Sequence, residues 1–139
     1  MTVSPSPQRR TSSEEAALLS LSKDAAVLRS LAKFTGNVFA NVAHRLAEEQ
    51  IVELLSARNV RIERIVSTGH ATPPDEWYDQ DRAEWVLLVA GAAGLIFEGE
   101  AEPLRLEPGS YVHIEAHIRH RVAWTDPSMP TIWVAIHYQ

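Results

Sequence analysis

From Asn59 onward the chain consists of short β-rich runs, and this pattern constrains the fold more than any other feature of the sequence. The runs are punctuated by Gly, Pro and Asp and read VRIERIVS, EWVLLVAG, AGLIFEG, PLRLEPG, SYVHIEA, HRVAWT and TIWVAIHY. No helical run separates them. Seven short strands in succession predict an antiparallel sandwich or barrel.

The region before these runs has a different pattern. Residues 1–12 are rich in Ser, Pro and Arg, and we expect this tail to be disordered. Ser12 followed by Glu15 fits a capping box, so a helix is expected to begin there. Its apolar positions then recur at steps of three and four residues, which predicts an amphipathic helix: Leu18, Leu21, Ala25, Leu28 and Ala32.

Gly36 and Asn37 are typical of the end of that helix. A second, shorter helix is expected from Glu48 to Ala57, with Leu54 and its apolar neighbours facing inward. The sequence therefore predicts a disordered tail over residues 1–12, a helical extension over residues 13–57 and an all-β barrel over residues 58–139.

Composition excludes several classes of function. The 139 residues carry a net charge of -5, which disfavours a nucleic-acid partner. The chain has no cysteine, so any metal ion would be held by His, carboxylate, amide or water ligands, as suits Fe, Mn, Ni, Cu or Zn. No apolar run approaches the length of a membrane span, and the polar N-terminus does not resemble a signal peptide. We therefore expect a cytoplasmic protein without a membrane partner.

One segment of unusual chemistry is STGHATPPDEWYDQDRAEWVLLVAG. Glu84 opens an otherwise apolar strand, where a carboxylate is costly unless it has a partner or lies at a solvated strand end. The other polar and aromatic candidates in this segment are His70, Trp77, Tyr78, Asp79 and Gln80.

A second segment, EPGSYVHIEAHIRHRVAWT, carries three of the six histidines within eight positions. Strand alternation places His120 on the same, inward face as Val122 and Trp124. His117 precedes the strand in a turn, where histidines are usually only solvated. His113 alternates with apolar neighbours and is expected to face outward. His120 is thus the strongest candidate for a site residue.

These two segments resemble the two motifs of the cupin superfamily, which are small β-barrels with a metal site inside. The first family motif ends in a Glu followed by six residues and a Gly, and Glu84-WVLLVA-Gly91 has this spacing. The second motif runs Gly, five residues, Pro, one residue, Gly, two residues and His. The stretch from Gly109 to His120 has that length.

The resemblance covers residues 59 to 138 and implies a double-stranded β-helix, or jelly-roll, preceded by one or two N-terminal helices. It is closer to a branch of small single-domain bacterial cupins of the cupin-2 type with WYDQ…EWV, PAHxxHRV and TIW…HY motifs. The matching residues are Trp77-Tyr78-Asp79-Gln80 with Glu84-Trp85-Val86, Ala116-His117 with His120-Arg121-Val122, and Thr131-Ile132-Trp133 with His137-Tyr138.

The departures from the family pattern affect the metal site. The two histidines that normally precede the Glu are absent, and Tyr78 and Gln80 stand at their positions. Glu84 and His120 remain at theirs. In the second motif, Glu115 and His117 replace the usual Pro and Gly. By resemblance, a divalent metal ion would be bound by Glu84 and His120, with Gln80 and His117 as auxiliary ligands.

The resemblance leaves three hypotheses about function. In the first, the chain is a metal-dependent enzyme that oxidises, cleaves or isomerises a small organic molecule, with Tyr78 as the proton donor. In the second, it is a metal-free acid–base enzyme in which His120 removes a proton, Tyr78 donates one and Glu84 fixes the imidazole tautomer. In the third, it is a non-catalytic barrel that binds a small ligand. The concentration of titratable groups favours an enzyme, and a homodimer is expected.

Overall fold

The structure of the protein is a computed structural model, and it describes residues 35–139. The disordered tail and the first helix predicted from the sequence lie outside these residues. Residues 38–139 form one compact unit. Its eight strands are β1 (Gln50–Ala57), β2 (Val60–Ser67), β3 (Ala83–Ala90), β4 (Ala93–Phe97), β5 (Leu104–Leu106), β6 (Tyr111–Ile114), β7 (His120–Thr125) and β8 (Thr131–Tyr138). The all-β fold and all seven predicted strands are confirmed.

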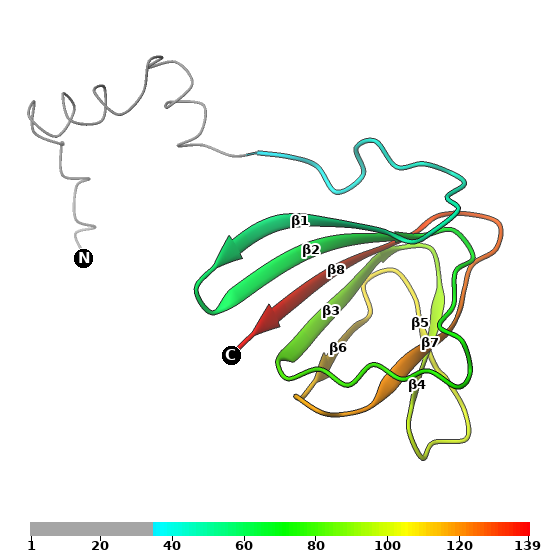
Figure 1. Cartoon of the computed structure of the whole chain (residues 1–139). Helices are drawn as coiled ribbons and strands as arrows, with labels where there is room; N and C mark the ends of the chain where they lie inside the picture. Colours follow the sequence, from blue (N-terminus) through cyan, green and yellow to red (C-terminus); the bar gives the residue numbers. More distant parts are fainter. Residues whose placement is uncertain (1–34) are drawn as a thin grey trace, which may run out of the picture. The chain divides into compact units, whose positions relative to one another are not determined.

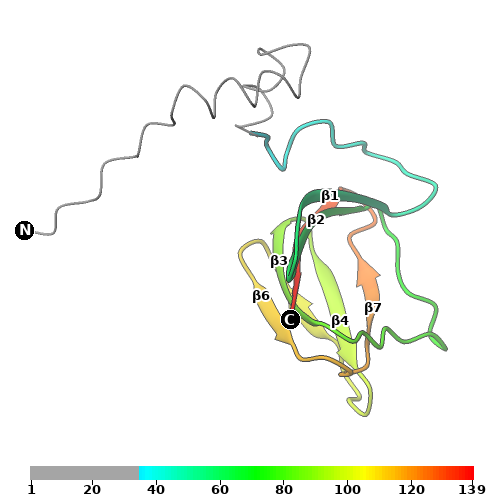
Figure 2. The ribbon, with the colours of Figure 1, turned by 60° about the vertical axis from the view of Figure 1, so that its left-hand side comes forward.

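The strands form two antiparallel sheets (Figure 1). The larger sheet has the order β1-β2-β8-β3-β6, and the smaller one has the order β5-β4-β7. In Figure 2, β3 and β6 lie on one side of the barrel and β4 and β7 on the other. Within residues 35–139 no helix is long and apolar enough to cross a membrane.

The predicted second helix is wrong. Residues 50–57 form β1, which pairs with β2 along its length, and residues 35–49 contain no helix. The register of this pairing shifts between Glu53 and Leu55, so Leu54 is a bulge residue. A bulge reverses the alternation of side chains along a strand. The apolar spacing of Ile51, Leu54 and Leu55 therefore looks helical although the segment is a strand.

Alternation along the larger sheet separates its core face from its outer face. Val86 and Leu88 of β3 lie inward beside Trp133 and Ala135 of β8, and all four are at most 5% exposed. Together with Leu95 and Ala93 of β4, Leu106 of β5 and Ile114 of β6, they form the apolar core. Four of these core residues, Val86, Leu95, Ile114 and Trp133, also line a cavity.

Candidate functional site

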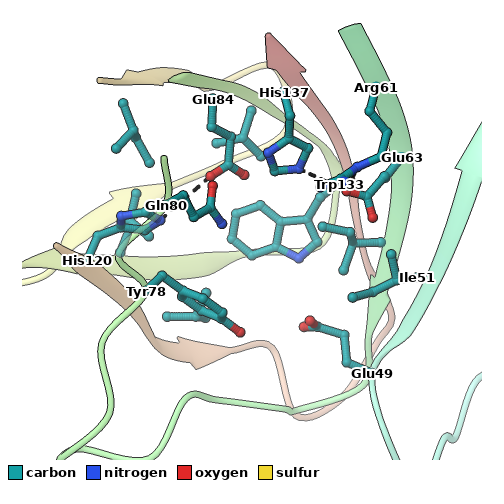
Figure 3. A pocket seen from close by; sticks show the side chains of 15 residues that line it. Glu49, Ile51, Arg61, Glu63, Tyr78, Gln80, Glu84, His120, Trp133 and His137 are labelled. Carbon is teal, nitrogen blue, oxygen red and sulfur yellow. Dashed lines mark hydrogen bonds and ion pairs between the residues drawn. The ribbon is translucent and has the colours of Figure 1, made fainter. Parts of the chain in front are cut away.

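A cavity of about 250 Å³ lies between the two sheets. Its walls are partly apolar, with Ile51, Ile65, Val86 and Trp133 among the lining residues. Figure 3 shows polar side chains pointing into it from both sides. This volume suits a small organic molecule, because sites for drug-sized ligands are usually larger. The polar lining residues are Glu49, Arg61, Glu63, Tyr78, Gln80, Glu84, His120 and His137.

The backbone places Tyr78 directly beside His120. The Tyr78 N–H donates to the His120 carbonyl at 2.8 Å, and the His120 N–H donates to the Tyr78 carbonyl at 3.2 Å, so the two form an antiparallel bridge. Further bonds from Thr72 to Val122 and from His117 to Gln80 continue this pairing. Paired residues in an antiparallel bridge project to the same side. Their rings accordingly lie 5.7 Å apart, centroid to centroid.

The His120 imidazole is held in a defined orientation. Its Nδ1 lies 2.8 Å from the Ile118 carbonyl oxygen, which only accepts hydrogen bonds, so Nδ1 carries a proton. Its Nε2 lies 3.6 Å from Glu84 Oε2, and both side chains are buried. The sequence predicted that Glu84 would fix the tautomer. In the structure the Ile118 carbonyl has that role, and Glu84 lies at the other nitrogen.

Opposing effects act on the charge of His120. Burial lowers the pKa of His120, but hydrogen bonding to Glu84 and to the Ile118 carbonyl, together with the Glu84 charge, outweighs burial and raises the pKa above 6.5. The 3.6 Å separation from Glu84 exceeds that of a well-formed hydrogen bond. Glu84 therefore stabilises the imidazolium, and both residues line the cavity.

The Tyr78 phenol is held in its neutral form. Tyr78 is 44% exposed, and its partial burial raises its pKa above 10.0. The negative charges of Glu49, Glu84 and Glu76 add to this effect, while a hydrogen bond with Thr72 opposes it. A neutral phenol is a hydrogen-bond and proton donor at ordinary pH. The site thus combines a proton donor, Tyr78, with an imidazole that can exchange a proton.

His117 lies away from the cavity. Its imidazole is 69% exposed, and Nδ1 lies 2.9 Å from Asp79 Oδ1 on the surface. Its φ of 64° is in the left-handed region, which glycine adopts without strain. This explains why the family motif has Gly at the position: a turn requires it. Asp79 is exposed with His117, whereas Gln80, two residues after Tyr78, lines the cavity.

Two other candidate histidines also lie elsewhere. His113 faces outward, as predicted, and its Nε2 lies 2.6 Å from the Tyr138 hydroxyl. His70 Nδ1 accepts a hydrogen bond from the Thr68 N–H, and its Nε2 lies 3.3 Å from the Ala47 carbonyl. Each of these rings is thus bound to a local partner outside the cavity that holds His120.

A second polar cluster lies in the same cavity. The motifs include His137 but did not indicate that it belongs to such a cluster. Glu63 Oε1 lies 2.9 Å from His137 Nε2 and 3.1 Å from Arg61 Nε. His137 is opposite Arg61 on β2 and opposite Glu84 on β3. The sequence carries a faint signal, since alternation along a strand places Arg61 and Glu63 on the same face of β2. An alternating polar face usually faces solvent, and only the sheet pairing shows that this one faces inward.

Glu49 completes the polar lining from the loop before β1. Its Oε2 accepts a hydrogen bond of 2.6 Å from the Ser67 hydroxyl. That hydroxyl oxygen in turn lies 3.2 Å from Trp133 Nε1, which donates to it. This chain of bonds holds the carboxylate at the cavity, and no sequence motif marks it.

Comparison with solved structures shows the family. The crystal structure of a proposed mannose-6-phosphate isomerase from Ralstonia eutropha JMP134 is 45% identical over 77% of this chain and 99% of that one, with a TM-score of 0.75. The chain is a cupin. A cupin superfamily protein from Desulfitobacterium hafniense DCB-2 matches with 15% identity over 76% of this chain and 92% of that one, at a TM-score of 0.61.

A cupin from Methanocaldococcus jannaschii with a double-stranded β-helix fold also matches, with 14% identity over 72% of this chain and 92% of that one, at a TM-score of 0.56. No family model matches the chain, and no curated protein matches it either. The resemblance to the cupin superfamily predicted from the sequence is therefore confirmed, and the jelly-roll fold with it.

Cupins commonly bind a metal ion, so we compare the potential ligand side chains of this cupin with a metal-binding arrangement. Among residues 35–139, no group of three or more His, Cys, Asp and Glu side chains is arranged to hold a metal ion. Glu84 and His120 face each other as an ion pair, and Gln80 adds only an amide. His137 is bonded to Glu63. In this arrangement the residues do not fit the three-His, one-Glu set that the family resemblance implies.

Proposed function

We propose that this cupin is an isomerase or epimerase that moves a proton on a carbon next to the carbonyl group of a small organic molecule. The observation that carries the proposal is the arrangement of His120. Its Nδ1 is bound to the Ile118 carbonyl, its Nε2 faces the cavity beside Glu84, and Tyr78 is its bridge partner. A positioned base and a positioned acid on one face are what such proton transfer needs.

In the proposed reaction, neutral His120 removes the proton from the carbon that bears a hydroxyl group. The C–H electron pair forms a carbon–carbon double bond, and the Tyr78 phenol protonates the former carbonyl oxygen, which gives an enediol. His120 then donates its proton to the former carbonyl carbon. The hydroxyl group on the carbon that was first deprotonated gives its proton to the Tyr78 phenolate and becomes the new carbonyl group. The sequence is redox-neutral and needs no co-reactant. The partly apolar cavity limits the access of water to the enediol.

The comparison with the Ralstonia protein supports the reaction class. Its name describes an isomerase, and interconversion of an aldose and a ketose is proton transfer of this kind. At 45% identity over nearly the whole of that chain, a shared reaction class is a reasonable expectation. The name alone does not carry over the phosphorylated substrate, because substrate choice depends on the residues of the cavity.

The test is exchange of substrate hydrogen with solvent deuterium, followed by NMR. The full chain is incubated in D₂O with mannose, fructose, the 6-phosphates of both sugars, and shorter hydroxy-carbonyl compounds. We expect exchange at the carbon next to the carbonyl, and we expect Tyr78→Phe and His120→Asn each to reduce its rate by about a hundredfold or more. Ile118→Val keeps the backbone carbonyl and is the matched control. No exchange with any compound would leave a non-catalytic binding protein.

Glu84 supplies a second readout. If His120 acts as the base, the rate rises with pH through the pKa of its imidazolium, above 6.5. Glu84→Gln removes the charge that favours the imidazolium, so the rising limb should move to lower pH. A limb that stays in place would show that Glu84 does not act through His120.

Elemental analysis of protein purified without added metal separates this proposal from the metal-dependent alternative. The proposal predicts that exchange persists after chelation of Fe, Mn, Ni, Cu and Zn. Near-stoichiometric metal that both Glu84→Ala and His120→Ala lose, together with loss of exchange on chelation, would establish the metalloenzyme instead.

A further inference from the structure

The charges that line the cavity are largely matched with one another. Glu63 contacts both Arg61 and His137, and Glu84 faces His120. Among residues 35–139, Arg61 is the only Arg that lines the cavity, and no Lys lines it. Its Nε is already bound to a carboxylate. The Glu63 carboxylate therefore already offsets the positive charge that an anionic ligand would need from this guanidinium group.

Glu49 adds a negative charge, and within residues 35–139 its carboxylate takes part in no ion pair. Its carboxylate is held by the Ser67 hydroxyl at 2.6 Å, which is a neutral donor. A carboxylate held in this way accepts further hydrogen bonds and repels anions. The cavity thus presents acceptor oxygens beside the apolar surfaces of Ile51 and Trp133.

A second cavity, of about 640 Å³, adjoins the first and shares Glu49, Tyr78 and Val122 with it. Two more carboxylates, Glu48 and Glu76, are among its lining residues, which include no Lys or Arg. Its one histidine, His70, accepts a hydrogen bond from the Thr68 N–H at Nδ1. This side of the site is therefore acidic as well.

From these charges we infer that the site selects a small polyhydroxylated compound without an anionic group, and that it excludes phosphate monoesters. Hydroxyl groups donate to Glu49 and to the Glu63 cluster, while the Trp133 ring contacts the apolar face of the ligand. A phosphate dianion would meet three glutamates, while Arg61, His137 and His120 each already face one of these carboxylates. This inference deepens the proposed isomerase and, for its substrate class, rests on it.

Calorimetric titration with matched pairs tests the inference without turnover. The probes are mannose against mannose 6-phosphate, fructose against fructose 6-phosphate, and inorganic phosphate alone. We expect the free sugar of at least one pair to bind at least about tenfold more tightly than its phosphate ester, and inorganic phosphate not to compete. Equal or tighter binding of the esters would overturn the inference, and so would the absence of binding by both free sugars.

Glu49→Gln keeps the shape of the side chain and removes its charge. It should reduce the preference for the free sugar over its ester by about tenfold. Glu102→Gln, an exposed change between β4 and β5, is the control and should leave the ratio unchanged. An unaltered ratio in Glu49→Gln would show that Glu49 does not set the selectivity.

The binding measurement tests the selectivity and the deuterium exchange tests the isomerase, so the two proposals can fail separately. Free sugars that bind without exchange would support the selectivity and remove the isomerase. Exchange in phosphate esters, with no binding of free sugars, would support the isomerase and overturn the selectivity.

Discussion

His117 and His120 lie three residues apart, yet their environments differ in every respect that matters for function. His120 is 5% exposed, with both ring nitrogens directed at defined partners. His117 is exposed in a turn at positive φ and pairs with Asp79 on the surface. At this scale, the direction of a side chain decides its role more than its identity.

His117→Gly is predicted to leave the site intact. Glycine adopts the positive φ without strain, and the exposed contact with Asp79 contributes little, so the free energy of unfolding should change by less than about 1 kcal/mol. Urea denaturation measures this change, and the exchange assay shows whether the rate stays the same. A loss of bound metal or of activity would instead restore His117 as an auxiliary ligand.

The His120–Glu84 pair is predicted to make stability depend on pH. The pKa of His120 is raised in the folded state, so the pair contributes fully below the unfolded value of 6.5 and loses its contribution as pH rises through the folded pKa. His120→Asn should therefore lower the free energy of unfolding more at about pH 5.5 than at about pH 8.5. A difference that is constant or grows with pH would contradict this assignment.

At the scale of elements, β7 brings the two motifs together. Residues 72–78 pair with β7 through Thr72 and Tyr78, which fixes Tyr78 against His120 although 42 positions separate them in the sequence. On its other side β7 pairs with β4, where the register shifts between Gly94 and Leu95. Trp124 packs over Gly94 at this irregularity. The position of His120 therefore depends on close packing between β4 and β7.

Gly94→Ala is predicted to disturb this packing. An added Cβ would overlap the indole of Trp124, so the variant should lose about 1–3 kcal/mol of unfolding free energy. Gly36→Ala is the control, because an added Cβ there meets nothing within 4 Å. Urea denaturation of both variants provides the comparison. Equal stability of the two would mean that Trp124 can move aside without cost.

At the scale of the whole molecule, the two sheets together create the site. The larger sheet contributes Glu63, His137 and Glu84, while the smaller one contributes His120. Neither sheet alone encloses a cavity. Buried ion pairs of this kind stabilise little in themselves, but breaking one leaves an uncompensated charge. The barrel is therefore both the scaffold of the site and the reason its charges are matched.

The homodimer expected from the sequence stays a prediction. Sedimentation equilibrium of the full chain should give about twice the 15.5 kDa mass of one chain. The same measurement on a chain that lacks residues 1–34 would show whether the predicted amphipathic helix takes part. A mass of one chain at all concentrations would contradict the prediction.

The sequence by itself determined the barrel and its seven later strands, and the candidate residues Tyr78, Gln80, Glu84 and His120 that it named line one cavity in the structure. Period-two alternation and turn residues are local signals, and they placed His120 inward and His113 outward correctly. The resemblance to the two cupin motifs, which are short local patterns, named Glu84, Tyr78 and Gln80 as candidates. These features depend on neighbours a few positions away, so they can be predicted from the chain alone.

Only the tertiary structure decided the rest. The bulge at Leu54 gives β1 an apolar spacing that resembles that of a helix, and the segment is nevertheless a strand because pairing with β2 outweighs the local apolar pattern. Glu63 and His137 are 74 positions apart and meet only because β2 and β8 are neighbours. Whether a polar strand face meets water or a cavity depends on the sheet opposite it. The charge of the site, and with it the choice of ligand, is therefore a property of the assembled barrel.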